Sequence, residues 1–132
     1  MKNQKSKSNN WYVGYIFSRN IDKNFIPQKV QNLVIRDFAT RMKFNLKLSA
    51  TEYKMKNSYL MLKSLNKKKP TYNGIIFYSL RMLFELKNYE SLIKKFLNNN
   101  IILISALEEI SIKKIKDINL LKAILYISKN NN

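Results

Sequence analysis

Short apolar runs alternate with amphipathic helical segments along this chain, and this alternation restricts its fold more than any other feature. The apolar runs cover residues 11–17, 44–48, 74–78 and 101–104, and they are rich in aromatic and β-branched residues. Continuous apolar runs of this length are typical of strands that are buried on both faces of a sheet. The sequence therefore predicts four short strands inside a layered domain.

Helical periodicity fills the segments that follow these strands. Apolar residues recur at helical spacing near 27–43, 59–65, 89–97 and 117–127. Strands that alternate with helices form parallel sheets joined by right-handed crossovers. A length of 132 residues suits one domain. We therefore expect the α/β class: a single three-layer domain with an about four-stranded, mainly parallel sheet and helices on both faces.

The two ends of the chain are polar. Residues 1–10 are predicted to be a disordered basic arm, 11–128 the α/β domain, and 129–132 a disordered tail. The basic opening is followed by an apolar run too short for a signal peptide, and no run approaches the ~20 apolar residues of a membrane span. We expect a cytoplasmic protein without a membrane span.

Missing residue types exclude several kinds of chemistry. The chain has no cysteine and no histidine, which excludes disulfides, thiolate metal sites and histidine-based catalysis. Its only glycines are Gly14 and Gly74, so no glycine-rich loop is available to bind a phosphate or a dinucleotide. We expect neither a metal nor a cofactor.

The net charge of +17 raises the question of nucleic acid. Most of the charge comes from lysine in a chain that is also rich in Asn, Ile and Tyr, a composition typical of an A+T-rich genome. Arginine is the residue favoured where bidentate phosphate contacts matter, and the chain has only four. We interpret the lysine charge mainly as base composition, with a polyanion-binding surface as the alternative.

Polar side chains follow each predicted strand. Residues 18–20, 49–53, 78–81 and 105–109 contain two arginines, several hydroxyls and carboxylates. Ligands of open parallel sheets bind beyond the carboxyl ends of the strands, so this edge is predicted to be an anion or sugar site. The alternative is that its serines and threonines cap the following helices.

The adjacent pair Glu108-Glu109 suggests acid/base chemistry or a magnesium site. Adjacent residues face different ways, however. One of the two carboxylates is therefore expected to start a helix, where the macrodipole favours it.

Five segments resemble the sporadic carbohydrate cluster protein family, bacterial proteins found among surface-polysaccharide genes. They are GYIFSRN (14–20), IPQKVQNLVIRDF (26–38), LSATEYKM (48–55), GIIFYSL (74–80) and ISALEEI (104–110). The resemblance spans about residues 12–118. It implies a role in polysaccharide or lipopolysaccharide biosynthesis without naming a reaction.

The family's recurring polar positions overlap the predicted strand-end edge. In this sequence they are Ser18, Arg19, Gln31, Asn32, Arg36, Asp37, Glu52, Tyr53, Ser79 and Glu108. After YSL the family usually has an acidic, proline-containing loop, whereas this chain has RMLFELKN. The surroundings of Arg81 therefore depart from the family pattern.

The predicted ligand is an anionic sugar, sugar phosphate or nucleotide-sugar. The catalytic candidates are Ser18 and Glu52, which would contact hydroxyls, and Glu108, which would serve as acid or base. The ligand-binding candidates are Arg19 and Arg81, which would hold the anion, together with Asn32, Arg36, Tyr53 and Ser79. An enzyme, a non-enzymatic binding protein and a pathway scaffold all remain open. Trp11 and its aromatic neighbours also suit a homodimer.

The layout of strands and helices is also similar to the catalytic domain of serine recombinases. That resemblance would make Ser18 the nucleophile and Arg81 a phosphate-binding arginine. The arginine that the recombinase pattern has just before the serine is missing, since Ile16 and Phe17 stand there. The Asp position is Leu80 and the later Arg position is Phe84. Phosphodiester attack needs those guanidiniums, and each loss costs on the order of 2–4 kcal/mol. A resolvase-like fold is expected without recombinase activity, and the alternative function is a nucleic-acid-binding module.

Overall fold

The computed structural model describes residues 10–130, and the side chains up to residue 127. The strands are β1 (Trp11–Ile16), β2 (Asn45–Thr51), β3 (Gly74–Phe77), β4 (Ile102–Ser105) and β5 (Ile110–Ile112). The helices are α1 (Gln28–Arg41), α2 (Leu60–Ser64), α3 (Tyr89–Asn98) and α4 (Ile118–Asn130), with short 3-10 turns η2 (Leu80–Leu83) and η3 (Ile115–Asp117).

The structure describes only part of each end that is predicted to be disordered. The predicted arm lies outside it except for Asn10. The predicted tail lies outside it at residues 131–132, while residues 129 and 130 belong to the last turn of α4.

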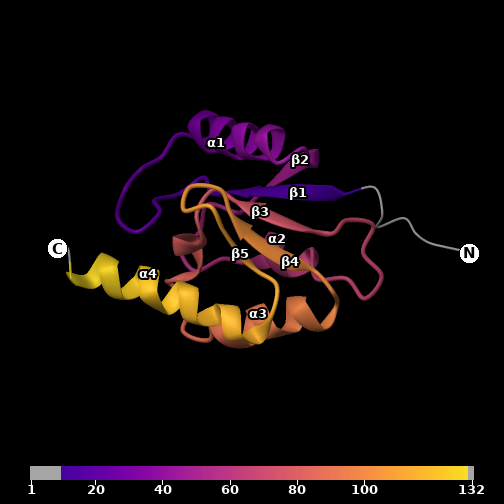
Figure 1. The fold of residues 1–132 in the computed structure, drawn as a ribbon. Helices are drawn as coiled ribbons and strands as arrows, with labels where there is room; N and C mark the ends of the chain where they lie inside the picture. Colours follow the sequence, from indigo (N-terminus) through magenta and orange to yellow (C-terminus); the bar gives the residue numbers. More distant parts are fainter. Residues whose placement is uncertain (1–9, 131–132) are drawn as a thin grey trace, which may run out of the picture.

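The five strands form one sheet in the order β2-β1-β3-β4-β5. The first four are parallel, and β5 runs antiparallel to β4. Figure 1 shows α1 over one face of the sheet, with α3 and α4 against the other face. The change of side follows from the strand order. The crossover from β1 to β2 and the crossover from β3 to β4 run in opposite directions across the sheet, and right-handed crossovers of opposite direction place their helices on opposite faces. The predicted three-layer α/β class is confirmed.

The strand register brings the carboxyl ends of the parallel strands to one edge. Ile16 of β1 is level with Thr51 of β2, and Phe77 is level with both Tyr15 and Ser105. The loops after β1, β2, β3 and β4 therefore begin side by side. This register is what allows residues distant in sequence to line a common site.

The core lies on both faces of the central strands. Every residue of β3 is buried, and so are the last five of β1 and the last three of β4. Residues buried on both faces need no polar alternation, which is why these strands appear as continuous apolar runs. Helix α1 covers its face with Ile35 and Phe38, and α3 covers the other with Ile93 and Phe96.

The fifth strand was not predicted. Residues 106–109 form a turn between β4 and β5, and Glu109 adopts a positive φ of 57° there. The expectation that Glu108 or Glu109 starts a helix is therefore wrong. Three residues of β5 give too short a pattern to recognise, and the hairpin forms because β4 offers an unpaired edge.

Candidate functional site

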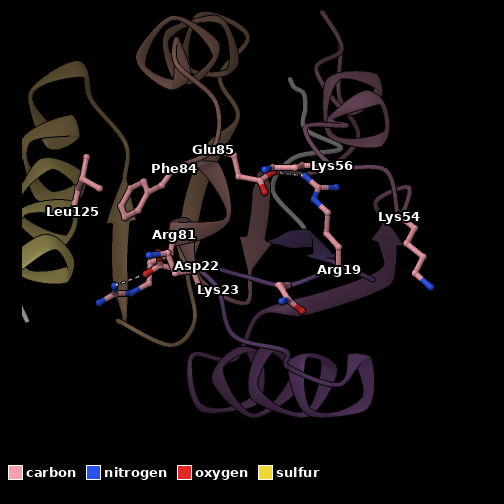
Figure 2. Close-up of a pocket in the computed structure, with 10 residues that line it drawn as sticks. Arg19, Asp22, Lys23, Lys54, Lys56, Arg81, Phe84, Glu85 and Leu125 are labelled. Atoms are coloured by element: carbon pink, nitrogen blue, oxygen red, sulfur yellow. Dashed lines mark hydrogen bonds and ion pairs between the residues drawn. The ribbon is translucent and has the colours of Figure 1, made fainter. Parts of the chain in front are cut away.

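A cavity of about 610 Å³ lies at the carboxyl ends of the strands. Figure 2 shows the side chains that line it, which come from the loops after β1, β2 and β3 and from helix α4. They are Arg19, Asn20, Asp22, Lys23, Lys54, Lys56, Arg81, Phe84, Glu85 and Leu125. Five of these ten residues are cationic and two are anionic, so the cavity favours a negatively charged ligand.

A tight turn brings Asp22 and Lys23 to the cavity. Ile21 and Asn24 exchange two backbone hydrogen bonds, at 2.7 and 2.9 Å. Between them Asp22 and Lys23 have φ values of 49° and 73°, in the left-handed region that residues other than glycine rarely adopt. The buried side chain of Ile21 anchors this conformation. The turn therefore keeps two charged residues at a fixed place on the cavity wall.

Arg19 is part of the cavity wall, and only 8% of its side chain is exposed. Its guanidinium donates to the backbone carbonyls of Tyr53 (3.0 Å) and Ser58 (3.1 Å) and pairs with Glu85 at 2.9 Å. It also lies 3.9 Å from the centroid of the Phe17 ring. Within the described residues its Nε has no hydrogen-bond partner. The terminal nitrogens of Arg19 thus join the loops after β1 and β2 to the segment after η2.

Arg81 is paired with two carboxylates. Its Nε lies 3.2 Å from Glu108, and its Nη1 lies 3.4 Å from Asp22. Glu108 also accepts hydrogen bonds from the hydroxyls of Ser79 and Ser105. A smaller cavity of about 170 Å³ adjoins this cluster and shares Asp22 and Arg81 with the larger one. The structure thus brings Ser79, Arg81 and Glu108 together, as the strand-end pattern predicts.

Three lysines supply the unpaired positive charge of the cavity. The side chains of Lys23, Lys54 and Lys56 are exposed, and none makes a hydrogen bond or ion pair with another residue in the described part of the chain. The interpretation of lysine charge as base composition does not identify these residues, because it favours the arginines as ligand contacts. The position of Lys54 is a usable signal, because Lys54 follows the end of β2 as closely as Arg19 follows the end of β1, and Lys56 comes next but one.

Glu52 is buried with only 1% of its surface exposed. Its carboxylate accepts from the Tyr15 hydroxyl (2.7 Å), the Ser58 hydroxyl (3.2 Å) and three backbone N–H groups, those of Tyr53, Met61 and Leu62. Burial alone would raise the pKa of Glu52, but the hydrogen bonds from Tyr15 and the backbone outweigh it and lower the pKa. These bonds occupy both oxygens, so the geometry gives the predicted catalytic role no support.

Four other predicted site residues do not line the cavity. Ser18 donates its hydroxyl to the carbonyl of Glu52 at 3.2 Å. Asn32 on α1 accepts from the Ser49 hydroxyl at 2.8 Å, and Arg36 is exposed on the same helix. Tyr53 is half exposed and contacts Arg19 through its backbone carbonyl. These four remain predictions as ligand contacts.

Gln31 holds the end of β1 through backbone hydrogen bonds, a role that its residue type and spacing do not predict. It is fully buried on α1, accepts from the backbone N–H of Phe17 at 2.9 Å and donates to the carbonyls of Phe17 and Ile26 at 2.9 and 2.8 Å. The side chain therefore satisfies the backbone where β1 ends. It fixes the start of the loop that carries Arg19.

The described residues form neither a metal-binding cluster nor a membrane-spanning helix. No three or more side chains of Asp, Glu, His or Cys come close enough to hold a metal ion among residues 10–127. No helix in the described segment is both long enough and apolar enough to cross a membrane.

Comparison with known proteins identifies the fold. The sequence matches no protein-family model and no curated protein. The structure is similar to that of the N-terminal catalytic domain of TP901-1 integrase, with a TM-score of 0.61 and 17% sequence identity over 90% of this chain and 96% of the other. The predicted resemblance to recombinases is thus confirmed at the level of the fold. This chain has the α/β fold of a recombinase catalytic domain.

Proposed function

We propose that this protein binds a phosphate-bearing ligand at the strand-end cavity, with a nucleic acid as the first candidate, and does not perform strand cleavage. The observation that carries the proposal is the set of lysines, Lys23, Lys54 and Lys56, around a cavity in a recombinase-like fold. Lysine ammonium groups bind phosphates as point charges and release counterions from a nucleic acid. The net charge of +17 favours the same class of ligand.

The arrangement around Ser18 argues against recombinase chemistry. Its hydroxyl is held by the carbonyl of Glu52, and the nearby Arg19 is engaged with two carbonyls and Glu85. Arg81 is likewise paired with Asp22 and Glu108. A phosphodiester transition state needs free guanidiniums to stabilise its charge. We therefore assign binding, and not bond cleavage, to this edge.

A direct test is binding of a fluorescent DNA duplex and of a single strand, by polarisation, from about 50 to about 200 mM salt. We expect binding that weakens as salt rises. The double variant Lys54→Ala/Lys56→Ala is expected to bind less tightly and to reduce the slope of log K against log salt by about 2, close to one unit per lost phosphate contact.

The matched control is Lys94→Ala/Lys95→Ala, which removes the same charge from the exposed face of α3, away from the cavity. It should change binding much less than the cavity variant. Equal losses in the two variants would show that the net charge alone attracts the nucleic acid. Absence of binding at the lowest salt would overturn the nucleic-acid proposal.

The second candidate is an anionic sugar or nucleotide-sugar of bacterial surface-polysaccharide biosynthesis. The observation that favours it is the concave shape of the site, because about 610 Å³ lies within the range of small-molecule cavities. The resemblance to the sporadic carbohydrate cluster family remains a prediction that supports the same ligand. A shift in thermal midpoint with nucleotide-sugars or sugar phosphates, lost in Lys54→Ala/Lys56→Ala, is the expected result.

A further inference from the structure

The apolar side chains of the cavity gather on the side of α4. Phe84, which follows η2, and Leu125 of α4 are the two large apolar side chains that line it. Figure 2 shows these two side chains on the α4 side of the cavity, with Asp22, Lys23 and Arg81 beside Phe84, and Arg19 and Lys54 on the opposite side. A ligand that carries only phosphate has no apolar group to place against Phe84 and Leu125.

We propose that the unit recognised by this cavity is a nucleotide, with its base against Phe84 and Leu125 and its phosphates near Lys54 and Lys56. This inference rests on the proposed function and specifies its ligand class. It applies equally to a nucleotide within a strand and to the nucleotide of a nucleotide-sugar, because the base and the phosphate are common to both.

The geometry of Phe84 supports a role as a base platform. The ring is only partly buried, and it packs against Tyr89 of α3 at 6.0 Å between centroids and an interplanar angle of 52°. This contact with Tyr89 restricts the position of the ring. Aromatic side chains held in this way stack on any base, because every base presents a flat π face.

Two carboxylates at the cavity limit where phosphate can bind. Asp22 and Glu85 each pair with an arginine, Arg81 and Arg19 respectively, at 3.4 and 2.9 Å. An anion that approaches these arginines meets a carboxylate, whereas Lys54 and Lys56 form no ion pair with a carboxylate within the described residues. These two lysines therefore define the phosphate subsite. Asp22 and Glu85 can accept hydrogen bonds from a ribose or a base.

The test is isothermal titration calorimetry of the full chain with ADP, UDP, ribose 5-phosphate and pyrophosphate at fixed salt. The nucleotides are expected to bind about tenfold more tightly than the two probes that lack a base. Phe84→Ala should lower the affinity for nucleotides about tenfold and leave the affinity for pyrophosphate unchanged. Phe84→Tyr should restore nucleotide affinity, and Leu125→Ala provides a second variant on the α4 side of the cavity if Phe84→Ala does not fold.

The two sources of the nucleotide are distinguished by competition. A single-stranded oligonucleotide that binds more tightly than a mononucleotide and displaces it identifies a strand as the ligand. A nucleotide-sugar that binds at least as tightly as UDP, with no displacement by the oligonucleotide, identifies the free nucleotide-sugar. Either result supports the nucleotide subsite.

The outcomes separate this inference from the proposed function. If pyrophosphate binds as tightly as ADP and UDP, and Phe84→Ala changes nothing, the nucleotide subsite is overturned while phosphate binding at the lysines stands. If none of the four probes and no oligonucleotide binds, both proposals fail.

Discussion

At the scale of single residues, Glu52 shows how a polar residue predicted to meet a ligand can instead hold the fold together. It joins the end of β2 to the start of α2, because it accepts from the backbone N–H groups of Met61 and Leu62. The helix α2 has no capping side chain of its own at its N-cap residue, Tyr59. A carboxylate near the first turn satisfies the N–H groups that a helix leaves unpaired.

The lowered pKa of Glu52 predicts a loss of stability in acid. A carboxyl group whose pKa lies below its ordinary value of 4.5 in the folded state stabilises the fold above about pH 4.5, and this contribution disappears as the pH falls through the lowered pKa. Glu52→Gln should reduce the free energy of unfolding by about 1–3 kcal/mol near neutral pH, since amide N–H groups would face backbone donors. The variant should also lose less stability than the wild type on acidification.

Urea unfolding at about pH 7 and about pH 3 measures this effect. Glu90→Gln is the control, because Glu90 forms an exposed ion pair with Lys122 on the surface. An acid response that is the same in Glu52→Gln and the wild type would contradict the assignment.

At the scale of elements, β3 and β4 can pair closely because Gly74 of β3 has no side chain. A Cβ atom on Gly74 would lie 2.5 Å from the backbone carbonyl oxygen of Ile102 and 2.6 Å from its side chain. Backbone in a paired strand cannot move aside without breaking the ladder. Gly14 of β1 is different, because the nearest atoms to its Cβ position belong to the side chain of Ser49.

Gly74→Ala should therefore destabilise the protein by about 1–3 kcal/mol, the usual cost of overpacking a core. Gly14→Ala should cost less, since Ser49 can rotate away. Thermal unfolding of the two variants beside the wild type tests the order. Equal destabilisation would show that the β2 edge is as rigid as the centre of the sheet.

At the scale of the whole molecule, the sheet carries one core that continues over both faces. Buried residues from the strands, from α1 on one face and from α3 on the other belong to the same cluster. The cavity lies outside this core, at the edge where the loops begin. Loops can therefore vary in charge without disturbing the packing that positions them.

A continuous core predicts that the described domain unfolds cooperatively. Trp11 is the only tryptophan, and it lies on β1 near the middle of the sheet, so its fluorescence reports the sheet. The helices can be followed by far-ultraviolet circular dichroism. We expect the two signals to give the same urea midpoint. Separate midpoints would indicate that the helices unfold independently of the sheet.

The sequence by itself determined the parallel strands, the helices between them and the edge where polar residues gather. Strands buried on both faces and helices with one apolar face leave periodic signals that need only local residues. The strand-end rule also placed Ser79, Arg81 and Glu108 in one cluster. It could not place β5, because three residues carry too little pattern.

Only the tertiary structure decided which polar residues form hydrogen bonds or ion pairs within the protein and which remain available in the cavity. Arg19 and Arg81 looked like the anion-binding residues, but each is paired with a carboxylate from a distant segment, Glu85 at 2.9 Å for Arg19 and Asp22 at 3.4 Å for Arg81. Lys54 and Lys56 looked like composition, yet they line the cavity. The physical reason is that the availability of a charge depends on its neighbours in space, and residue types and spacing do not record those neighbours.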